Sequence, residues 1–185
     1  MPLLTLTSDI GSPDYLVGVI KAQLLQVNPD FQIVDISHNI PPFNLPQAAY
    51  VCRSAIRNSP DFTYHLILVN LFEKKPEQLL LAFHNNQYLL CADNGLLTMI
   101  LEDRPELVIG IPLEKDTIRN TIYLTSVMGK VINQLVNGEP IQRIGQPDVT
   151  YLEKRHLRPA LDENFIEGQI VFIDNLENVI VNITR

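Results

Sequence analysis

The stretch that decides the fold is residues 3–18, LLTLTSDIGSPDYLVG. It opens with a short run of leucine and threonine that predicts a strand, and the polar turn at residues 8–11 follows directly. A helix is expected to begin near Asp14. Small ligands bind outside the carboxyl end of such a strand in an open α/β sheet. Asp9 and Asp14 lie at this corner, where two carboxylates suit hydroxyl groups or a cation and argue against a bound phosphate.

Apolar runs and helical stripes alternate along the rest of the chain. Strands are expected at residues 3–7, 31–36, 64–69, 79–83, 88–91, 107–111 and 117–123. Helices are expected at residues 14–27, 46–57, 96–102 and 126–136. The HNNQ segment between two of these strands predicts a β-hairpin. The pattern indicates an α/β fold with a mainly parallel central sheet flanked by helices.

Three regions are expected along the chain. Residues 1–138 form the α/β domain that would bind the ligand, and residues 139–164 are a polar, proline-bearing linker. Residues 165–185 contain two β runs that predict a hairpin, the start of an incomplete C-terminal β domain. Because two strands alone are marginally stable, the hairpin is expected to add to the main domain, to a neighbouring subunit or to a second domain that continues beyond it.

The composition argues against several classes of protein. Apolar residues make up 46% and charged residues 19%, so a hydrophobic core can form. A net charge of −7 without a basic stripe argues against a nucleic-acid partner. No apolar run approaches the roughly 18 residues needed to span a bilayer. The start MPLLTLTSD lacks the basic segment of a secretory signal, so the expected location is the cytoplasm.

Cysteine and histidine are placed as structural residues rather than as ligands. Cys52 and Cys91 are isolated in apolar settings, which favours two buried free thiols over a nucleophile or a disulfide. His38 follows a strand and is expected to make a structural hydrogen bond. The other histidines lack carboxylate or cysteine partners at ligand spacing, so no metal site is expected. The charged cluster at residues 73–77, EKKPE, is expected to be a solvated loop.

Four blocks carry a resemblance to a known family: SDIGSPDYLVGVIK, VDISHNIPPFNLPQAAYV, ADNGLLT and IDNLENVIVNI. In this order and at these separations, the chain resembles the S-adenosylmethionine (SAM) hydroxide adenosyltransferases. These SAM hydrolases are relatives of the SAM-dependent fluorinase and chlorinase. The resemblance runs from Leu3 to about Ile183, with the family's C-terminal domain shortened. No block is decisive alone, but four in register are specific.

The resemblance implies an α/β domain followed by a small β-barrel domain, and a homotrimer. SAM would bind where the N-terminal domain of one subunit meets the C-terminal domain of the next. The implied reaction is substitution at the ribose C5′, in which water or a halide attacks and methionine leaves. The products would be adenosine, or a 5′-halo-adenosine, together with L-methionine.

The resemblance also assigns substrate-binding positions. Asp9 matches the aspartate that accepts hydrogen bonds from both ribose hydroxyls, and Asp14 matches an acid of the same loop. Asn94 matches an asparagine of the ribose pocket, and Phe43 matches an aromatic residue that halogenases place near the sugar.

Three more positions lie later in the chain. Thr121 begins the segment that matches the family's Thr-Phe-His. Asp174 and Asn178 match an acid and an amide that reach the methionine amine and the adenine edge.

The positions that would activate water depart from the family pattern. Asn70 stands where the hydrolases have an aspartate, and residues 71–76 lack the family's glycine-rich turn and its arginine. Lys74 or Lys75 would approximate that cation. Tyr123 stands where the hydrolases have a histidine. An amide is not a base, and tyrosine is a poor base near neutral pH.

Two further departures concern the halogenases and the second domain. Halogenases carry a tyrosine at the position of Tyr123, but their halide-binding serine aligns with Leu124. Leu176 and Glu177 replace a Phe-Gly pair.

The expected protein is therefore a SAM-binding family member that turns SAM over slowly or not at all, with Asn70 and Tyr123 in degenerate catalytic positions. One alternative is a catalytically silent nucleoside-binding or assembly protein. Another is halogenase-like chemistry with Tyr123 near the attack line.

Overall fold

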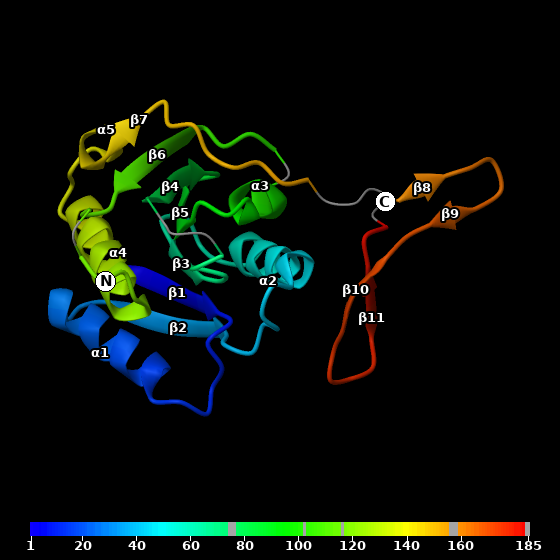
Figure 1. The fold of residues 1–185 in the computed structure, drawn as a ribbon, viewed down its shortest axis with the longest axis horizontal. Helices are drawn as coiled ribbons and strands as arrows, with labels where there is room; N and C mark the ends of the chain where they lie inside the picture. Colours follow the sequence, from blue (N-terminus) through cyan, green and yellow to red (C-terminus); the bar gives the residue numbers. More distant parts are fainter. Residues whose placement is uncertain (74–76, 102, 116, 156–158, 184–185) are drawn as a thin grey trace.

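The computed structural model describes residues 1–73, 77–101, 103–115, 117–155 and 159–183 (Figure 1). Its helices are α1 (Leu16–Val27), α2 (Leu45–Arg57), α3 (Leu96–Leu101), α4 (Thr121–Val136) and α5 (Ile141–Ile144). The strands of the central sheet are β1 (Leu3–Ser8), β2 (Gln32–Ser37), β3 (Tyr64–Leu68), β4 (Gln78–His84), β5 (Gln87–Ala92), β6 (Leu107–Pro112) and β7 (Gln146–Pro147). Four short strands follow: β8 (Ala160–Leu161), β9 (Ile166–Glu167), β10 (Ile170–Ile173) and β11 (Val179–Val181).

The central sheet has the strand order β2-β1-β3-β5-β4-β6-β7. Strands β2, β1, β3 and β5 pair in parallel, whereas β4 is antiparallel to both of its neighbours. Since β7 is antiparallel to β6, five of the seven strands point the same way. The α/β fold with a mainly parallel sheet flanked by helices is thus confirmed. The chain moves from β1 to β2 on one side and then to β3 on the other, so the strand order reverses between β1 and β3.

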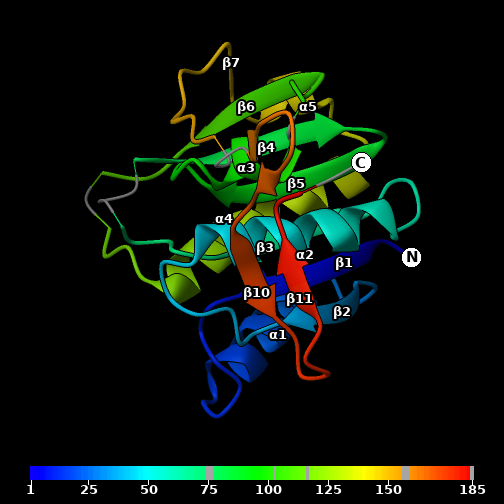
Figure 2. The same ribbon diagram turned by 90° about the vertical axis from the view of Figure 1, so that its right-hand side faces the viewer.

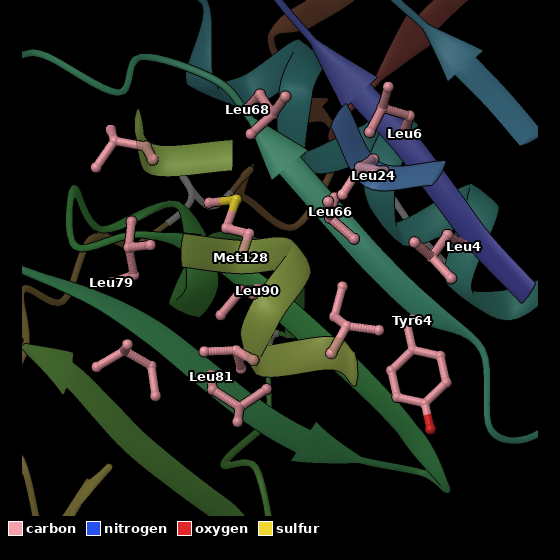
Figure 3. Packing of buried hydrophobic residues seen from close by; sticks show 14 of the residues in the cluster. Leu4, Leu6, Leu24, Tyr64, Leu66, Leu68, Leu79, Leu81, Leu90 and Met128 are labelled. Carbon is pink, nitrogen blue, oxygen red and sulfur yellow. The ribbon is translucent and has the colours of Figure 1, made fainter. Parts of the chain in front are cut away.

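Helices cover both faces of the sheet because the inner strands are apolar on both sides. Leu66 and Leu68 face a core that includes Leu24 of α1 and Met128 of α4, as Figure 3 shows. The alternate residues of the same strand region face a second core with α2 and α3. Alternation within a strand sends successive side chains to opposite faces, so a nearly continuous apolar run needs helices on both faces.

The predicted hairpin between β4 and β5 is confirmed. Asn85 and Asn86 form its turn with φ values of +48° and +59°. Asparagine tolerates this left-handed conformation, and two such residues match the right-handed twist of the flanking strands.

The strand predicted at residues 117–123 is wrong. Helix α4 begins at Thr121, five residues before the predicted helix start. The side chain of Asn120 accepts a hydrogen bond from the Tyr123 backbone N–H at 2.8 Å, which caps the helix. The β-branched and aromatic residues at 121–123 suggested a strand, but the cap and the packing of α4 on the sheet determine the outcome.

The predicted linker at residues 139–164 contains structure that belongs to the main sheet. Helix α5 lies there, and β7 pairs with β6. Further along the chain, β8 pairs with β9. Strands β10 and β11 pair with each other and form the predicted hairpin. Figures 1 and 2 show β10 and β11 beside α2. Phe172 of β10 contacts Tyr50 of α2, and their ring centroids are 6.0 Å apart. Whether residues 165–185 begin a second domain stays a prediction.

Candidate functional site

The carboxyl ends of β1 and β3 meet at the point where the strand order reverses. Asp9 follows β1, and its Oδ2 accepts a hydrogen bond from the Asn70 backbone N–H at 2.8 Å. Asn70 follows β3, is buried and has a φ of +50°, a left-handed conformation that asparagine tolerates better than most residues. Ligands of open α/β sheets bind in the crevice at such a reversal. The structure therefore brings two of the predicted residues, Asp9 and Asn70, together at the expected corner.

A cavity of about 950 Å³ opens along this edge of the sheet. It reaches from the end of β3 to the ends of β5 and β6, and amide and carboxylate side chains make up much of its wall. Its polar lining includes Asn70, Glu73, Gln78, Asp93 and Asn94. Because amides and carboxylates outnumber cations here, the cavity suits a ligand with hydroxyl and amine groups better than a phosphate.

Asn94 lines the cavity, but its amide is used by the protein itself. Its Nδ2 donates to the carbonyls of Val69 and Asn70 at 3.0 and 3.1 Å, and its Oδ1 accepts from the Leu96 N–H at 3.0 Å. Only 5% of the residue is exposed. In the structure, the Asn94 side chain connects the end of β3 to the start of α3. Its contact with a ribose stays a prediction.

Glu73 makes a contact that the sequence did not predict. Its Oε2 accepts a hydrogen bond from Asn70 Nδ2 at 2.7 Å, and Lys154 Nζ lies 3.3 Å from the same oxygen. About one third of each of the two charged side chains is exposed. Glu73 is thus attached to the site, although the cluster at 73–77 was expected to be a solvated loop. Lys74 and Lys75, the predicted stand-ins for arginine, lie outside the described residues.

Lys154 lies next to Glu73 because hydrogen bonds hold residues 150–154 against the segment between β5 and α3. Asp93 Oδ1 accepts from the Leu152 N–H, and Thr98 Oγ1 bonds to the backbone of Lys154, donating to its carbonyl and accepting from its N–H. Gly95 has a φ of +87°, and a Cβ there would lie 2.7 Å from Lys154 Cδ. Glycine is required at this position by both its backbone conformation and the lysine stem that lies over it.

The remaining N-terminal candidates are separate from the cavity lining. Asp14 is exposed and accepts a hydrogen bond from the Tyr15 N–H at 2.6 Å, and α1 begins only at Leu16. Phe43 is 74% exposed in the loop before α2. These residues stay predicted binding residues, which the structure does not bring into contact with Asp9.

Thr121 and Tyr123 lie in the first turn of α4. The Thr121 carbonyl accepts a hydrogen bond from Thr125 Oγ1 at 2.8 Å, as part of the helix. The Tyr123 hydroxyl accepts from the Glu114 backbone N–H at 3.1 Å. This bond ties the start of α4 to the loop after β6, so the described role of Tyr123 is structural.

Asp174 and Asn178 shape the turn between β10 and β11. Asp174 Oδ1 accepts from the N–H groups of Leu176 and Asn178, and its Oδ2 accepts from Asn178 Nδ2 at 2.8 Å. The Asn178 side chain, followed by its backbone N–H, lowers the pKa of Asp174 below its ordinary value. Neither residue lines the cavity at the sheet edge of its own chain.

The predicted hydrogen bond of His38 and the predicted burial of the two free cysteines are confirmed. His38 Nδ1 lies 2.8 Å from Ser8 Oγ, while the His38 carbonyl accepts from the Gly11 N–H at 2.7 Å, so His38 supports the turn that carries Asp9. Cys52 and Cys91 are free and buried. Burial raises the pKa of both thiols, that of Cys52 to about 12, which favours the protonated form over the reactive thiolate.

Glu73 and Lys154 contact one another at this corner, although no sequence motif predicts either of them there. The one local signal for Glu73 is its place three positions after Asn70. Lys154 lies more than eighty positions away from it and had no such signal. Within the described residues, no group of three or more His, Cys, Asp or Glu side chains is placed to hold a metal ion. Among those residues, no helix is long and apolar enough to cross a membrane.

The fold and the corner define an α/β protein with a polar cavity for a small ligand at the reversal of its strand order. Residues 4–145 match the family described as SAM hydroxide adenosyltransferase N-terminal domain. The match covers most of the chain, and the chain belongs to this family.

Relatives of known name and structure agree with this assignment. Two proteins named (R)-S-adenosyl-L-methionine hydrolase are each 28% identical to the chain. The one from Methanocaldococcus jannaschii aligns over 100% of this chain and 68% of its own length, and the one from Thermus thermophilus over 96% and 73%. An uncharacterized conserved protein of Thermotoga maritima superimposes with a TM-score of 0.85 at 26% identity, over 97% of this chain and 71% of that one. A conserved hypothetical protein of Thermus thermophilus gives a TM-score of 0.71 at 26% identity, over 100% and 74%.

Proposed function

We propose that this chain binds SAM at the carboxyl edge of its sheet and directs substitution at the ribose C5′ toward water, giving adenosine and L-methionine. The observation that carries the proposal is the Asp9 carboxylate at the reversal of strand order, held by the Asn70 N–H and next to a polar cavity. The other oxygen of this carboxylate accepts no hydrogen bond from the described residues, so the group is suited to accept hydrogen bonds from the two neighbouring hydroxyls of a ribose. Membership of the family and the names of the relatives support SAM as the substrate.

Substitution at C5′ asks little of the protein, because a sulfonium is already a good leaving group. The site must align the nucleophile behind C5′ and remove its surrounding water. Asn70 cannot accept a proton from water, and the Tyr123 hydroxyl is occupied by the Glu114 N–H. These two observations favour a second candidate, a protein that binds SAM without converting it. The halogenase alternative has less support, because Leu124 is fully buried and offers no hydrogen-bond donor to a halide.

A homotrimer is part of the proposal. Asp174 and Asn178 lie outside the cavity of their own chain, as required if they serve the site of a neighbouring copy. Several apolar side chains of the C-terminal hairpins are also exposed, among them Ile170, Ile173 and Leu176. Such a surface suits burial by a second chain or by further residues. Light scattering on the purified protein tests the trimer directly.

Titration calorimetry with Asp9→Asn tests the site. Loss of charged hydrogen bonds to two hydroxyls is expected to weaken SAM binding about ten- to a hundredfold. Asp30→Asn, the same change in the turn after α1, is the matched control and is expected to bind as the wild type does. Equal affinity of Asp9→Asn and wild type would contradict the proposed site. Chromatography of the same mixtures for adenosine separates the hydrolase from the silent binder, since only the hydrolase forms product.

A further inference from the structure

The residue that replaces the family's aspartate, Asn70, connects two carboxylates. Its backbone N–H donates to Asp9 Oδ2 at 2.8 Å, and its side-chain Nδ2 donates to Glu73 Oε2 at 2.7 Å. We propose that Glu73 is the catalytic base of this chain and accepts the proton of the attacking water in place of the missing aspartate. This inference rests on the proposed function, because it needs SAM at the same edge of the sheet.

The position of Glu73 fits this role. It lines the cavity, and about one third of its side chain is exposed, so a water molecule can reach it. A carboxylate offers about four acceptor positions. The described donors to Glu73 are Asn70 Nδ2 and Lys154 Nζ, which leaves acceptor capacity for the O–H of a water molecule.

The other carboxylates near Asn70 are less suitable. Both oxygens of Asp93 are occupied, because Oδ1 accepts from the Leu152 N–H and Oδ2 accepts from Gln78 Nε2, each at 2.8 Å. Asp9 holds the Asn70 N–H and is the proposed partner of the ribose hydroxyls. Both oxygens of Glu73 also have contacts, but among the described residues these come from the side chains of Asn70 and Lys154 and hold no backbone segment in place. Glu73 is therefore the carboxylate in contact with Asn70 that is best suited to accept a proton.

Lys154 acts as a positioning residue for this base. Its Nζ lies 3.3 and 3.4 Å from the two oxygens of Glu73. The backbone of Lys154 is anchored to Thr98, and its stem lies over Gly95, so the ammonium group approaches Glu73 from a fixed direction. With Asn70 on one side and Lys154 on the other, the carboxylate is oriented even though it belongs to a loop.

The water oxygen forms a bond to C5′ while the C5′–S bond breaks, and the bonding electron pair moves to sulfur. Methionine leaves as a neutral thioether, and adenosine keeps the new hydroxyl group. The proton released by the water passes to the Glu73 carboxylate and then to solvent, which restores the base.

Glu73→Gln tests the inference, measured as adenosine and methionine formed at saturating SAM together with calorimetric SAM affinity. Glutamine keeps the size of the side chain and accepts from Asn70 through its remaining oxygen, so the variant is expected to fold. Removal of a general base is expected to lower the turnover rate by about 10²–10⁴ while the affinity stays within about twofold. Glu106→Gln, the same change on an exposed glutamate just before β6 and outside the cavity lining, is the matched control and is expected to keep the wild-type rate.

Each contrary outcome has a separate meaning. A Glu73→Gln rate equal to wild type overturns the base and leaves SAM binding intact. Wild-type protein that binds SAM but forms no adenosine also overturns the base, and it favours the silent binder. Wild-type protein that does not bind SAM overturns the proposed function together with this inference. Partial return of the rate when formate is added to Glu73→Ala would support a missing carboxylate directly.

Discussion

Replacement of Asn94 by alanine tests whether the Asn94 amide stabilises the fold or binds the ligand. The substitution leaves the carbonyls of Val69 and Asn70 and the N–H of Leu96 without their partner, in a place that is 5% exposed. At about 1 kcal/mol for each hydrogen bond, the free energy of unfolding is expected to fall by about 3 kcal/mol. That is a large share of the roughly 5–15 kcal/mol that stabilises a typical domain.

Urea unfolding measures this loss. With a slope of about 2 kcal/mol per molar urea, the midpoint is expected to fall by about 1.5 M. Asn94→Asp keeps the acceptor for the Leu96 N–H but turns a carboxylate oxygen toward two carbonyl oxygens, so it is expected to destabilise at least as strongly. Asn58→Ala is the matched control, because that amide is exposed and makes one bond, to the Ser54 carbonyl. Its effect is expected to stay within about 0.5 kcal/mol.

The opposite pattern would refute the assignment. If Asn94→Ala unfolds at the same urea concentration as wild type but no longer binds SAM, its amide serves the ligand rather than the end of β3.

Further predictions concern groups away from the cavity. Burial lowers the pKa of His65 below 6.5, so as the pH falls through 6.5 the unfolded chain binds a proton that the folded chain does not yet bind. The free energy of unfolding is therefore expected to be highest above pH 6.5 and to decrease as the pH falls toward the folded pKa. Urea unfolding from about pH 7.5 to about pH 5 measures this decrease, which is expected to be absent in His65→Gln. Cys52 and Cys91 are expected to react with a thiol reagent only in denaturant, and rapid labelling of the native protein would contradict their burial. Asn120→Ala is expected to lower the melting temperature through the loss of about 1 kcal/mol of helix capping, because the Tyr123 N–H loses its acceptor; an unchanged melting temperature would show that the cap is unimportant.

Most of the fold could be predicted from the sequence because its signals are local. The apolar run of β3 and the asparagine turn of the β4–β5 hairpin each determine their own conformation. The start of α4 could not be predicted in this way. Residues 121–123 have the composition of a strand, and the cap by Asn120 and the burial of Leu124 against the sheet outweigh that preference.

Of the candidate site, the positions of Asp9 and Asn70 could be predicted from the sequence, whereas the contact between Glu73 and Lys154 could not. Asp9 and Asn70 each follow an apolar strand directly, so a parallel sheet places them at one edge. Lys154 comes to Glu73 because Asp93 and Thr98 accept hydrogen bonds from the Leu152 and Lys154 N–H groups of an otherwise irregular segment. Such a long-range contact has no periodicity, and residues 150–154 have the composition of a linker. The sequence therefore suggested the place of the ribose but not the partner of Glu73.

Because the aliphatic part of Lys154 lies over Gly95, the residue types at these two distant positions depend on one another. A side chain at 95 and a long side chain at 154 compete for the same volume, so a change at either position alters what selection permits at the other. Glycine at position 95 leaves the space that the lysine at position 154 occupies. Because the Lys154 Cβ would itself lie 2.9 Å from a Cβ at position 95, even alanine at 154 would leave part of this steric conflict, and the positive φ of residue 95 favours glycine independently.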